Sequence, residues 1–138
     1  MSEVKVNKIT PRSGTSLQLG EAGDTINLTT ATVNLPTGVG GTSWQAVKTA
    51  NFTAVAGEGY FVNTTGGVIT ATLPSSATIG NEVSIIDYAG TADTNNITIG
   101  RNGHNIQGAA SDMTVTTERA AFTLVYVDST QGWLLKDK

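Results

Sequence analysis

Hydrophobic and polar residues alternate in short runs through most of the chain after residue 44. A period of two is typical of β-strands that bury one face. The runs that we expect to form strands are 60–62, 68–73, 83–88, 97–99, 113–116, 122–127 and 133–135. Turn-forming residues separate them, and Asn102-Gly103 is a strong hairpin signal because both residues tolerate positive φ. Strands at this spacing predict an antiparallel β-sandwich of jelly-roll type over residues 44–138, and thus an all-β protein.

The region before residue 44 has a different pattern, a weak repeat of an apolar residue, an amide and a leucine. The three units are Leu17-Gln18-Leu19, Ile26-Asn27-Leu28 and Val33-Asn34-Leu35. Strands this short cannot bury their apolar side chains within one chain, and repeat units of this kind need neighbours to make a core. We therefore predict an intertwined trimeric β-stem over residues 20–43. The alternative is a polar linker that contains these leucines by chance.

Glycine and serine mark the boundary between the two regions. Residues 37–43 read Thr-Gly-Val-Gly-Gly-Thr-Ser, which is typical of a flexible joint. Trp44 follows this joint directly, so we place it at the trimer interface where the stem meets the head, with exposure as the alternative. The expected organisation is an attachment segment at 1–19, the stem and joint at 20–43, and the head at 44–138. Within the head, Phe61, Phe122 and Trp133 each lie in an apolar run and are expected in the core.

The composition excludes several classes of function. Charged residues make up 14% of the chain, well below the roughly 25% of an average soluble domain, and the net charge is −3. Binding to nucleic acid needs clustered Lys and Arg, which this chain lacks. No apolar run is long enough for a membrane helix, and the N-terminus lacks the apolar core of a signal peptide. We therefore expect a protein that is made in a cytoplasm, without nucleic-acid binding or membrane insertion.

Candidate chemistry is sparse. The chain has no cysteine and one histidine, which excludes a disulfide, a thiolate metal site and a multi-histidine zinc site within one copy. His104 has no nucleophile near it in sequence and is interpreted as a loop residue beside Asn102-Gly103. Paired carboxylates can hydrolyse glycans, but those of this chain are interpreted as solubility and turn residues. They are Asp24, Glu58, Glu82, Asp87, Asp93, Asp112, Glu118 and Asp128. We expect no catalytic residues, no metal and no cofactor.

Two stretches resemble the fibre and fibre-like virion structural proteins of tailed bacteriophages, especially those of marine and cyanobacterial hosts. The first comprises Val4 to Thr15, with its Pro-x-Ser-Gly-Thr turn, and the Leu-Gly-x-x-Gly-Asp-Thr unit that begins at Leu19. The second comprises residues 69–74, 80–87, 96–99 and 102–103 together with Trp133. The resemblance implies a homotrimer with a slender N-terminal attachment part and a globular C-terminal head. The short chain fits a stubby fibre on the capsid or the tail better than a long tail fibre.

The expected function follows from these features. We expect a virion structural protein: a trimeric fibre, knob or decoration protein that contacts other virion proteins through its N-terminus. The alternating residues Val4, Val6 and Ile9 are the candidates for attachment, as a strand added to an exposed sheet edge. The candidates for the trimer interface are Leu17, Leu19, Ile26, Leu28, Val33, Leu35 and Trp44. Contact with a host surface glycan or protein is a further possible role. The alternatives are an adhesion module that binds host glycans and a polysaccharide depolymerase.

Overall fold

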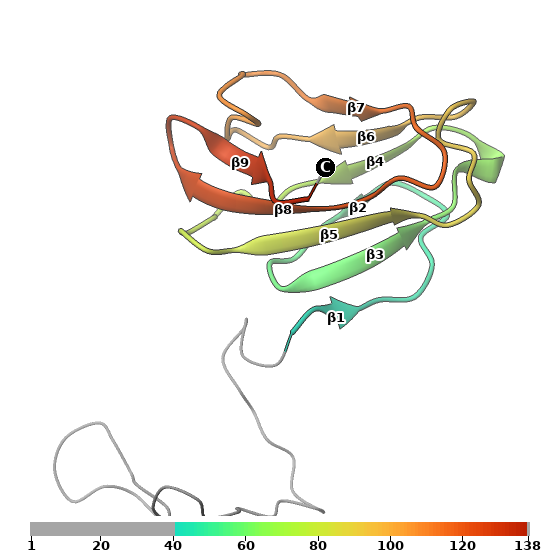
Figure 1. Ribbon diagram of the computed structural model, residues 1–138, viewed down its shortest axis with the longest axis horizontal. Coiled ribbons are helices and arrows are strands. Elements are labelled where there is room, and N and C mark those ends of the chain that lie inside the picture. The colour runs from blue at the N-terminus through green and yellow to red at the C-terminus, as the bar shows by residue number, and fades with distance from the viewer. Residues whose placement is uncertain (1–40, 138) are drawn as a thin grey trace, which may run out of the picture. The chain divides into compact units, whose positions relative to one another are not determined.

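The structure is a computed structural model that describes residues 41–137, and in these residues the regular secondary structure consists almost entirely of β-strands (Figure 1). The strands are β1 (Ser43–Trp44), β2 (Phe52–Thr53), β3 (Glu58–Val62), β4 (Ile69–Thr72), β5 (Glu82–Asp87), β6 (Ile97–Gly100), β7 (Met113–Val115), β8 (Ala121–Asp128) and β9 (Gly132–Leu135). One short 3-10 turn, η1, spans Thr64–Gly66. Each run expected to be a strand overlaps one of β3 to β9, so the all-β prediction is confirmed.

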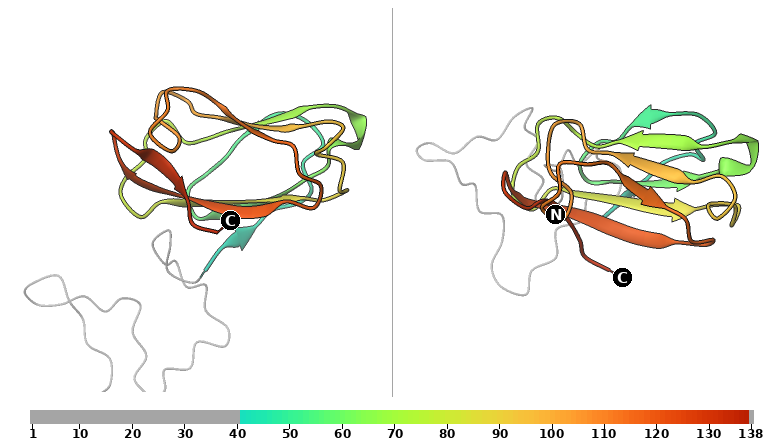
Figure 2. Two further views of the ribbon diagram at one scale, coloured as in Figure 1. Left: turned by 45° about the horizontal axis from the view of Figure 1, so that its top comes forward. Right: turned by 90° about the horizontal axis from the view of Figure 1, so that it is seen from above.

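The strands form two sheets, which lie as two layers in Figure 2. The larger sheet has the order β1-β3-β5-β8-β9, and the smaller sheet has the order β2-β4-β6-β7. The pairs β1–β3, β3–β5, β2–β4 and β4–β6 are parallel. The pairs β5–β8, β6–β7 and β8–β9 are antiparallel. The sheets are therefore mixed, and the prediction of purely antiparallel pairing was wrong.

The parallel pairs arise because the chain changes sheet after each of its first strands. β1, β3 and β5 belong to the larger sheet, whereas β2, β4 and β6 belong to the smaller one. Each strand of the other sheet thus acts as the crossover that parallel neighbours require. After β6 the chain reverses, because β7 pairs antiparallel with β6 and β8 with β5. Alternation of side chains does not encode strand direction, so the sequence pattern could not distinguish this winding from a series of hairpins.

The core lies between the two sheets and takes one face of each. Both sheets contribute aliphatic side chains, and the larger sheet adds aromatic ones. From the larger sheet come Tyr60, Val62, Val83, Ile85, Leu124, Tyr126 and Trp133, and from β4, β6, β7 and the residue after β4 come Ile69, Ala71, Leu73, Ile97, Ile99 and Val115. Full burial of a large apolar side chain contributes about 1.5–3 kcal/mol. This shared core is the main stabilising contribution to the domain.

The three aromatic residues that were expected in the core differ in their burial. Trp133 is completely buried, as predicted, and Phe122 is partly buried against the core. The prediction that Phe61 lies in the core was wrong. Phe61 is in register with Ile86 and lies on the face of β3 opposite the buried Tyr60 and Val62. All three residues of 60–62 are apolar, so the alternation did not show which of them faces inward.

The Asn102-Gly103 turn has the predicted backbone but not the predicted connection. Asn102 has φ 47° and Gly103 has φ 92°, the left-handed conformations that the pair tolerates. However, β6 ends at Gly100 and β7 begins at Met113, so the turn lies within a longer connection. The Nδ2 of Asn102 donates to the backbone carbonyl of Leu73 at 2.8 Å. This bond holds the loop against the end of β4.

Candidate functional site

Trp44 is a predicted interface residue within the described part of the chain, and it lies on β1 at the edge of the larger sheet. Its indole stacks on the ring of Phe61, with ring centroids 4.9 Å apart and an interplanar angle of 29°. The side chain is nevertheless 47% exposed. The two aromatic rings therefore form a surface feature and not a part of the core.

Gly59 provides the space for the indole. A Cβ atom at Gly59 would lie 2.6 Å from Cε3 of Trp44 and 2.7 Å from Cγ2 of Thr42. Atoms cannot approach this closely without a shift, so a larger residue would displace the indole or its strand. Gly59 pairs with Trp44 in the parallel register of β1 and β3. The Gly57-Glu58-Gly59 sequence thus serves the packing of an aromatic side chain.

The outer face of the larger sheet extends from this aromatic pair across β5 and β8. Phe61 is in register with Ile86, and Ile86 with Ala121, which places these side chains in one row. In the next row the hydroxyls of Ser84 and Thr123 form a hydrogen bond of 2.9 Å. A shallow hollow of about 250 Å³ lies on this face; its lining includes Thr42, Trp44, Ser84, Ile86, Thr123 and Asp137. We call the surface made by Trp44, Phe61, Ser84, Ile86, Ala121 and Thr123 the outer face.

A second hollow, of about 380 Å³, lies beside the outer face and is more polar. Its lining includes Gly41, Thr42, Glu58, Asn81, Glu82 and Lys136. Glu82 accepts a hydrogen bond from Nζ of Lys136 at 3.2 Å, and both side chains are well exposed. Glu58 accepts a hydrogen bond from the hydroxyl of Tyr60. Each of the two carboxylates therefore already has a protein partner.

Tyr60 is a buried residue of β3 and packs against Phe52 of β2. Its hydroxyl donates to Glu58 and accepts a hydrogen bond of 2.8 Å from the backbone N–H of Val55. Its ring lies 4.6 Å from that of Phe52, and Nζ of Lys48 lies 5.6 Å from the centroid of each ring. Burial is the largest cause and the hydrogen bond to Glu58 the next, and together they raise the pKa of Tyr60 to about 12. Tyr60 is thus fully protonated near neutral pH, which suits a structural role.

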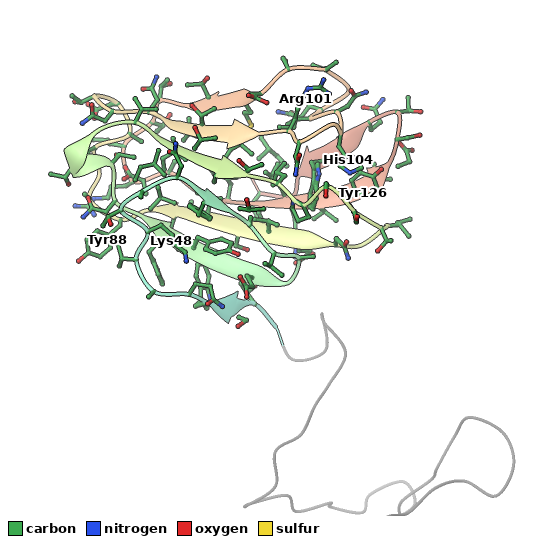
Figure 3. The ribbon with its side chains drawn as sticks, turned by 180° about the vertical axis from the view of Figure 1, so that it is seen from behind. Lys48, Tyr88, Arg101, His104 and Tyr126 are labelled. Carbon is green, nitrogen blue, oxygen red and sulfur yellow. The ribbon has the colours of Figure 1, made fainter. Side chains whose placement is uncertain are left out.

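His104, the chain's single histidine, lies at the opposite end of the domain from Lys48 and Tyr88 (Figure 3). Its Nε2 lies 3.0 Å from the backbone carbonyl oxygen of Ser75. Its ring meets the ring of Tyr126 edge-on, with centroids 4.9 Å apart. The Arg101 guanidinium donates to the backbone carbonyl of His104 at 3.1 Å. These contacts fasten the loop after β6 to the larger sheet.

Neither a cation site nor a membrane segment is found in residues 41–137. In this part of the chain, no three His, Asp or Glu side chains gather closely enough to hold a metal ion. The same residues contain no helix with the length and apolar character needed to cross a bilayer.

The other predicted site residues lie outside the described residues. They are the attachment candidates Val4, Val6 and Ile9 and the stem candidates Leu17, Leu19, Ile26, Leu28, Val33 and Leu35. The attachment strand and the trimeric stem therefore stay predictions, as do the domain boundaries at residues 19 and 43.

Sequence reasoning missed Phe61 and Ile86 as surface residues. The signal was present, because Val83-Ser84-Ile85-Ile86 carries an apolar residue at a position that alternation assigns to the solvent side. An isoleucine on the outer side of a central strand is notable where it adjoins other apolar side chains. Its partners, Phe61 and Trp44, come from β3 and β1, and only the register of the sheet brings them together.

No protein-family model matches the chain, and no curated protein matches it significantly.

Proposed function

We propose that this chain is a structural protein of a bacteriophage particle: a short trimeric fibre or knob on the capsid or tail. In this proposal the two sheets form a β-sandwich head, residues 20–43 form the trimeric stem, and residues 1–19 attach to the particle. The all-β fold of residues 41–137 supports the proposal of a β-sandwich head. The resemblance of the sequence to phage fibre proteins supports the proposals of the stem, the attachment segment and the place on a phage particle.

The exposed Trp44–Phe61 stack is the observation that carries the proposal. A monomeric head gains little from leaving a tryptophan 47% exposed on an edge strand. Tryptophan is enriched where protein surfaces meet, because it buries a large area with little loss of side-chain freedom. Trp44 lies on β1 and directly follows the glycine-rich segment 37–43. An assembly that holds several copies at this point would cover the indole.

In this proposal the protein would join the phage particle at one end and contact a host surface at the other. The Val4-Lys5-Val6 pattern suits a strand that pairs with a free sheet edge of a capsid or tail protein through main-chain hydrogen bonds. Three copies in one fibre would attach at three points, and their heads would contact a host surface with the combined strength of three weak sites.

A second candidate function is binding of host glycans, and the same aromatic pair favours it. A flat, exposed indole is a surface on which a sugar ring can stack. An array of surface glycans probed with the full chain and with Trp44→Ala tests this candidate. Glycan binding by the full chain that is lost in Trp44→Ala would support the glycan-binding function. An array on which the full chain binds no glycan would contradict it.

The proposal includes no enzymatic activity. Glu58 and Glu82, the carboxylates of the polar hollow, each accept a hydrogen bond from a neighbouring side chain. His104 contacts a backbone carbonyl and a tyrosine ring, and no nucleophilic side chain is among the contacts described above. Release of reducing ends from a host polysaccharide by the purified chain would contradict this part of the proposal.

Immunogold electron microscopy tests the virion assignment directly. Antibodies against the purified chain are applied to phage particles from the cultures in which the protein is produced. We expect gold label at regular positions on the capsid or the tail. Label confined to the soluble fraction, with unlabelled intact and mildly disrupted particles, would overturn the proposal.

A further inference from the structure

We propose that the outer face is the surface through which the heads of neighbouring copies of this chain contact one another. The inference rests on the trimer of the proposed function and goes beyond it, because it assigns the contact between heads to one face of one sheet.

The outer face differs from the other apolar surface positions of the domain. Val47, Val55, Val68, Ile79 and Tyr88 are also exposed, but each lies in a loop or turn and outside the strands. Trp44 lies on a strand and is stacked on Phe61, which is in register with Ile86. A contiguous apolar row on a flat sheet can be covered by another flat surface, whereas single loop residues cannot form one interface.

The charges at the outer face favour a second copy as the occupant. The Ser84–Thr123 hydrogen bond satisfies the hydroxyls of the second row within the chain. Glu82 and Lys136 form an ion pair with an N–O distance of 3.2 Å, and Asp137 is the single charged residue among those that line the shallow hollow. A surface with so little uncompensated charge does not repel an identical surface. A strongly basic or acidic partner would find little there to bind.

The position of the outer face in the chain provides the second argument. Eight residues lie between Leu35, the last leucine of the predicted stem, and Trp44, and the distance from Leu35 to Trp44 is at most about 30 Å when this segment is extended. Stems joined at one axis would therefore keep the three copies of Trp44 close to that axis. Short tethers of this kind give effective concentrations in the millimolar range. Under that condition a small apolar face is sufficient for association.

Cysteine labelling in the full chain tests the inference, and the chain has no native cysteine to interfere. Ala121→Cys places a thiol at an exposed position of the outer face, and Thr114→Cys places one at an exposed strand position of the smaller sheet. We expect maleimide to label A121C at least roughly tenfold more slowly than T114C in the assembled protein, because buried interface residues are excluded from solvent. Adding Trp44→Glu to A121C should abolish this protection.

A pair of isoleucine variants provides an independent measurement. Ile86→Glu introduces a charge into the outer face, whereas Ile79→Glu introduces the same charge at a loop position that is 78% exposed. Sedimentation velocity over a dilution series should show weaker association for I86E by at least roughly tenfold. I79E should behave like the wild type. Circular dichroism of each variant verifies that the head is folded.

The outcomes separate the two proposals. A wild-type chain that is monomeric at all concentrations removes the trimer and this inference together. A trimer in which A121C and T114C are labelled equally fast, and in which I86E associates normally, leaves the trimer standing and overturns the inference. A monomer with a protected A121C would mean that the chain covers its own outer face, which also overturns it.

Discussion

The carboxylate of Asp87 accepts a hydrogen bond of 3.0 Å from the backbone N–H of Arg119, 32 positions further along the chain. Asp87 is 1% exposed and lies at the end of β5. The same carboxylate also accepts from the backbone N–H groups of Gly90, Thr91 and Ala92, at 3.1, 3.4 and 3.2 Å. One buried side chain thus joins the loop after β5 to the loop before β8.

Replacing Asp87 should be costly for stability. Asp87→Asn keeps the shape of the side chain but replaces one acceptor oxygen by an N–H donor that faces backbone N–H groups. Loss of charged hydrogen bonds to buried donors costs about 2–4 kcal/mol in the free energy of unfolding. Urea denaturation measures the difference. Asp93→Asn, at an exposed position of the same loop, is the control and should change stability by less than about 0.5 kcal/mol. Equal stability of the two variants would show that the Asp87 contacts do not hold the loops.

Stability should fall at high pH because of Tyr60. The pKa of Tyr60 is about 12 in the folded protein, above its usual value of 10.0, chiefly because the ring is buried. The unfolded chain therefore loses this proton first. The contribution of Tyr60 is complete below pH 10 and is lost as the pH rises towards 12.

Comparison with Tyr60→Phe isolates this effect. The variant should lose about 1–2 kcal/mol at pH 8, because Glu58 and the N–H of Val55 each lose a partner. Urea denaturation of both proteins at pH 8, 10 and 11 should show the advantage of the wild type shrinking with rising pH. A constant advantage across this range would contradict the raised pKa.

Two glycines with positive φ, Gly132 and Gly103, should respond very differently to a methyl group. Gly132 has φ 70°, and a Cβ atom there would lie 1.8 Å from the backbone carbonyl oxygen of Asn105. Gly103 has φ 92°, but a Cβ atom at Gly103 would have no other atom within 4 Å. Gly103→Ala should therefore cost about 1–2 kcal/mol, from backbone strain alone. Gly132→Ala should cost more than about 4 kcal/mol or prevent folding, because a backbone atom must move.

Thermal unfolding of the two alanine variants measures this difference. Failure of G132A to fold while G103A folds would satisfy the prediction. Similar midpoints for both variants would mean that the loop at Asn105 moves aside easily, in contradiction to the backbone hydrogen bond of 2.9 Å from Trp133 to the carbonyl of Asn105.

The positions of the strands could be predicted from the sequence, but their pairing could not. The run 97–99 reads Ile-Thr-Ile and became β6, and residues 69–72 read Ile-Thr-Ala-Thr and became β4. Whether neighbours run parallel or antiparallel depends on which sheet the chain enters next, and alternation does not contain that information. The direction of a side chain was equally ambiguous where every residue is apolar, as at Tyr60-Phe61-Val62.

The candidate site was predictable only in part. Trp44 is conspicuous because it follows the glycine-rich joint, but Phe61 and Ile86 join it only through the register of β1, β3 and β5. The role of Asp87 depends on backbone groups as far away as Arg119. Contacts between residues so distant in sequence follow from the fold and leave no local pattern.

The central claim is that the chain forms a trimer, and the number of chains in the assembly that the purified 138-residue chain forms in solution tests it most directly. Native mass spectrometry at micromolar concentration should give a mass of about 43 kDa, three times the 14.2 kDa of one chain. A single species at 14.2 kDa under these conditions would contradict the trimer. The proposed fibre and the proposed contact between its heads would then fall with it.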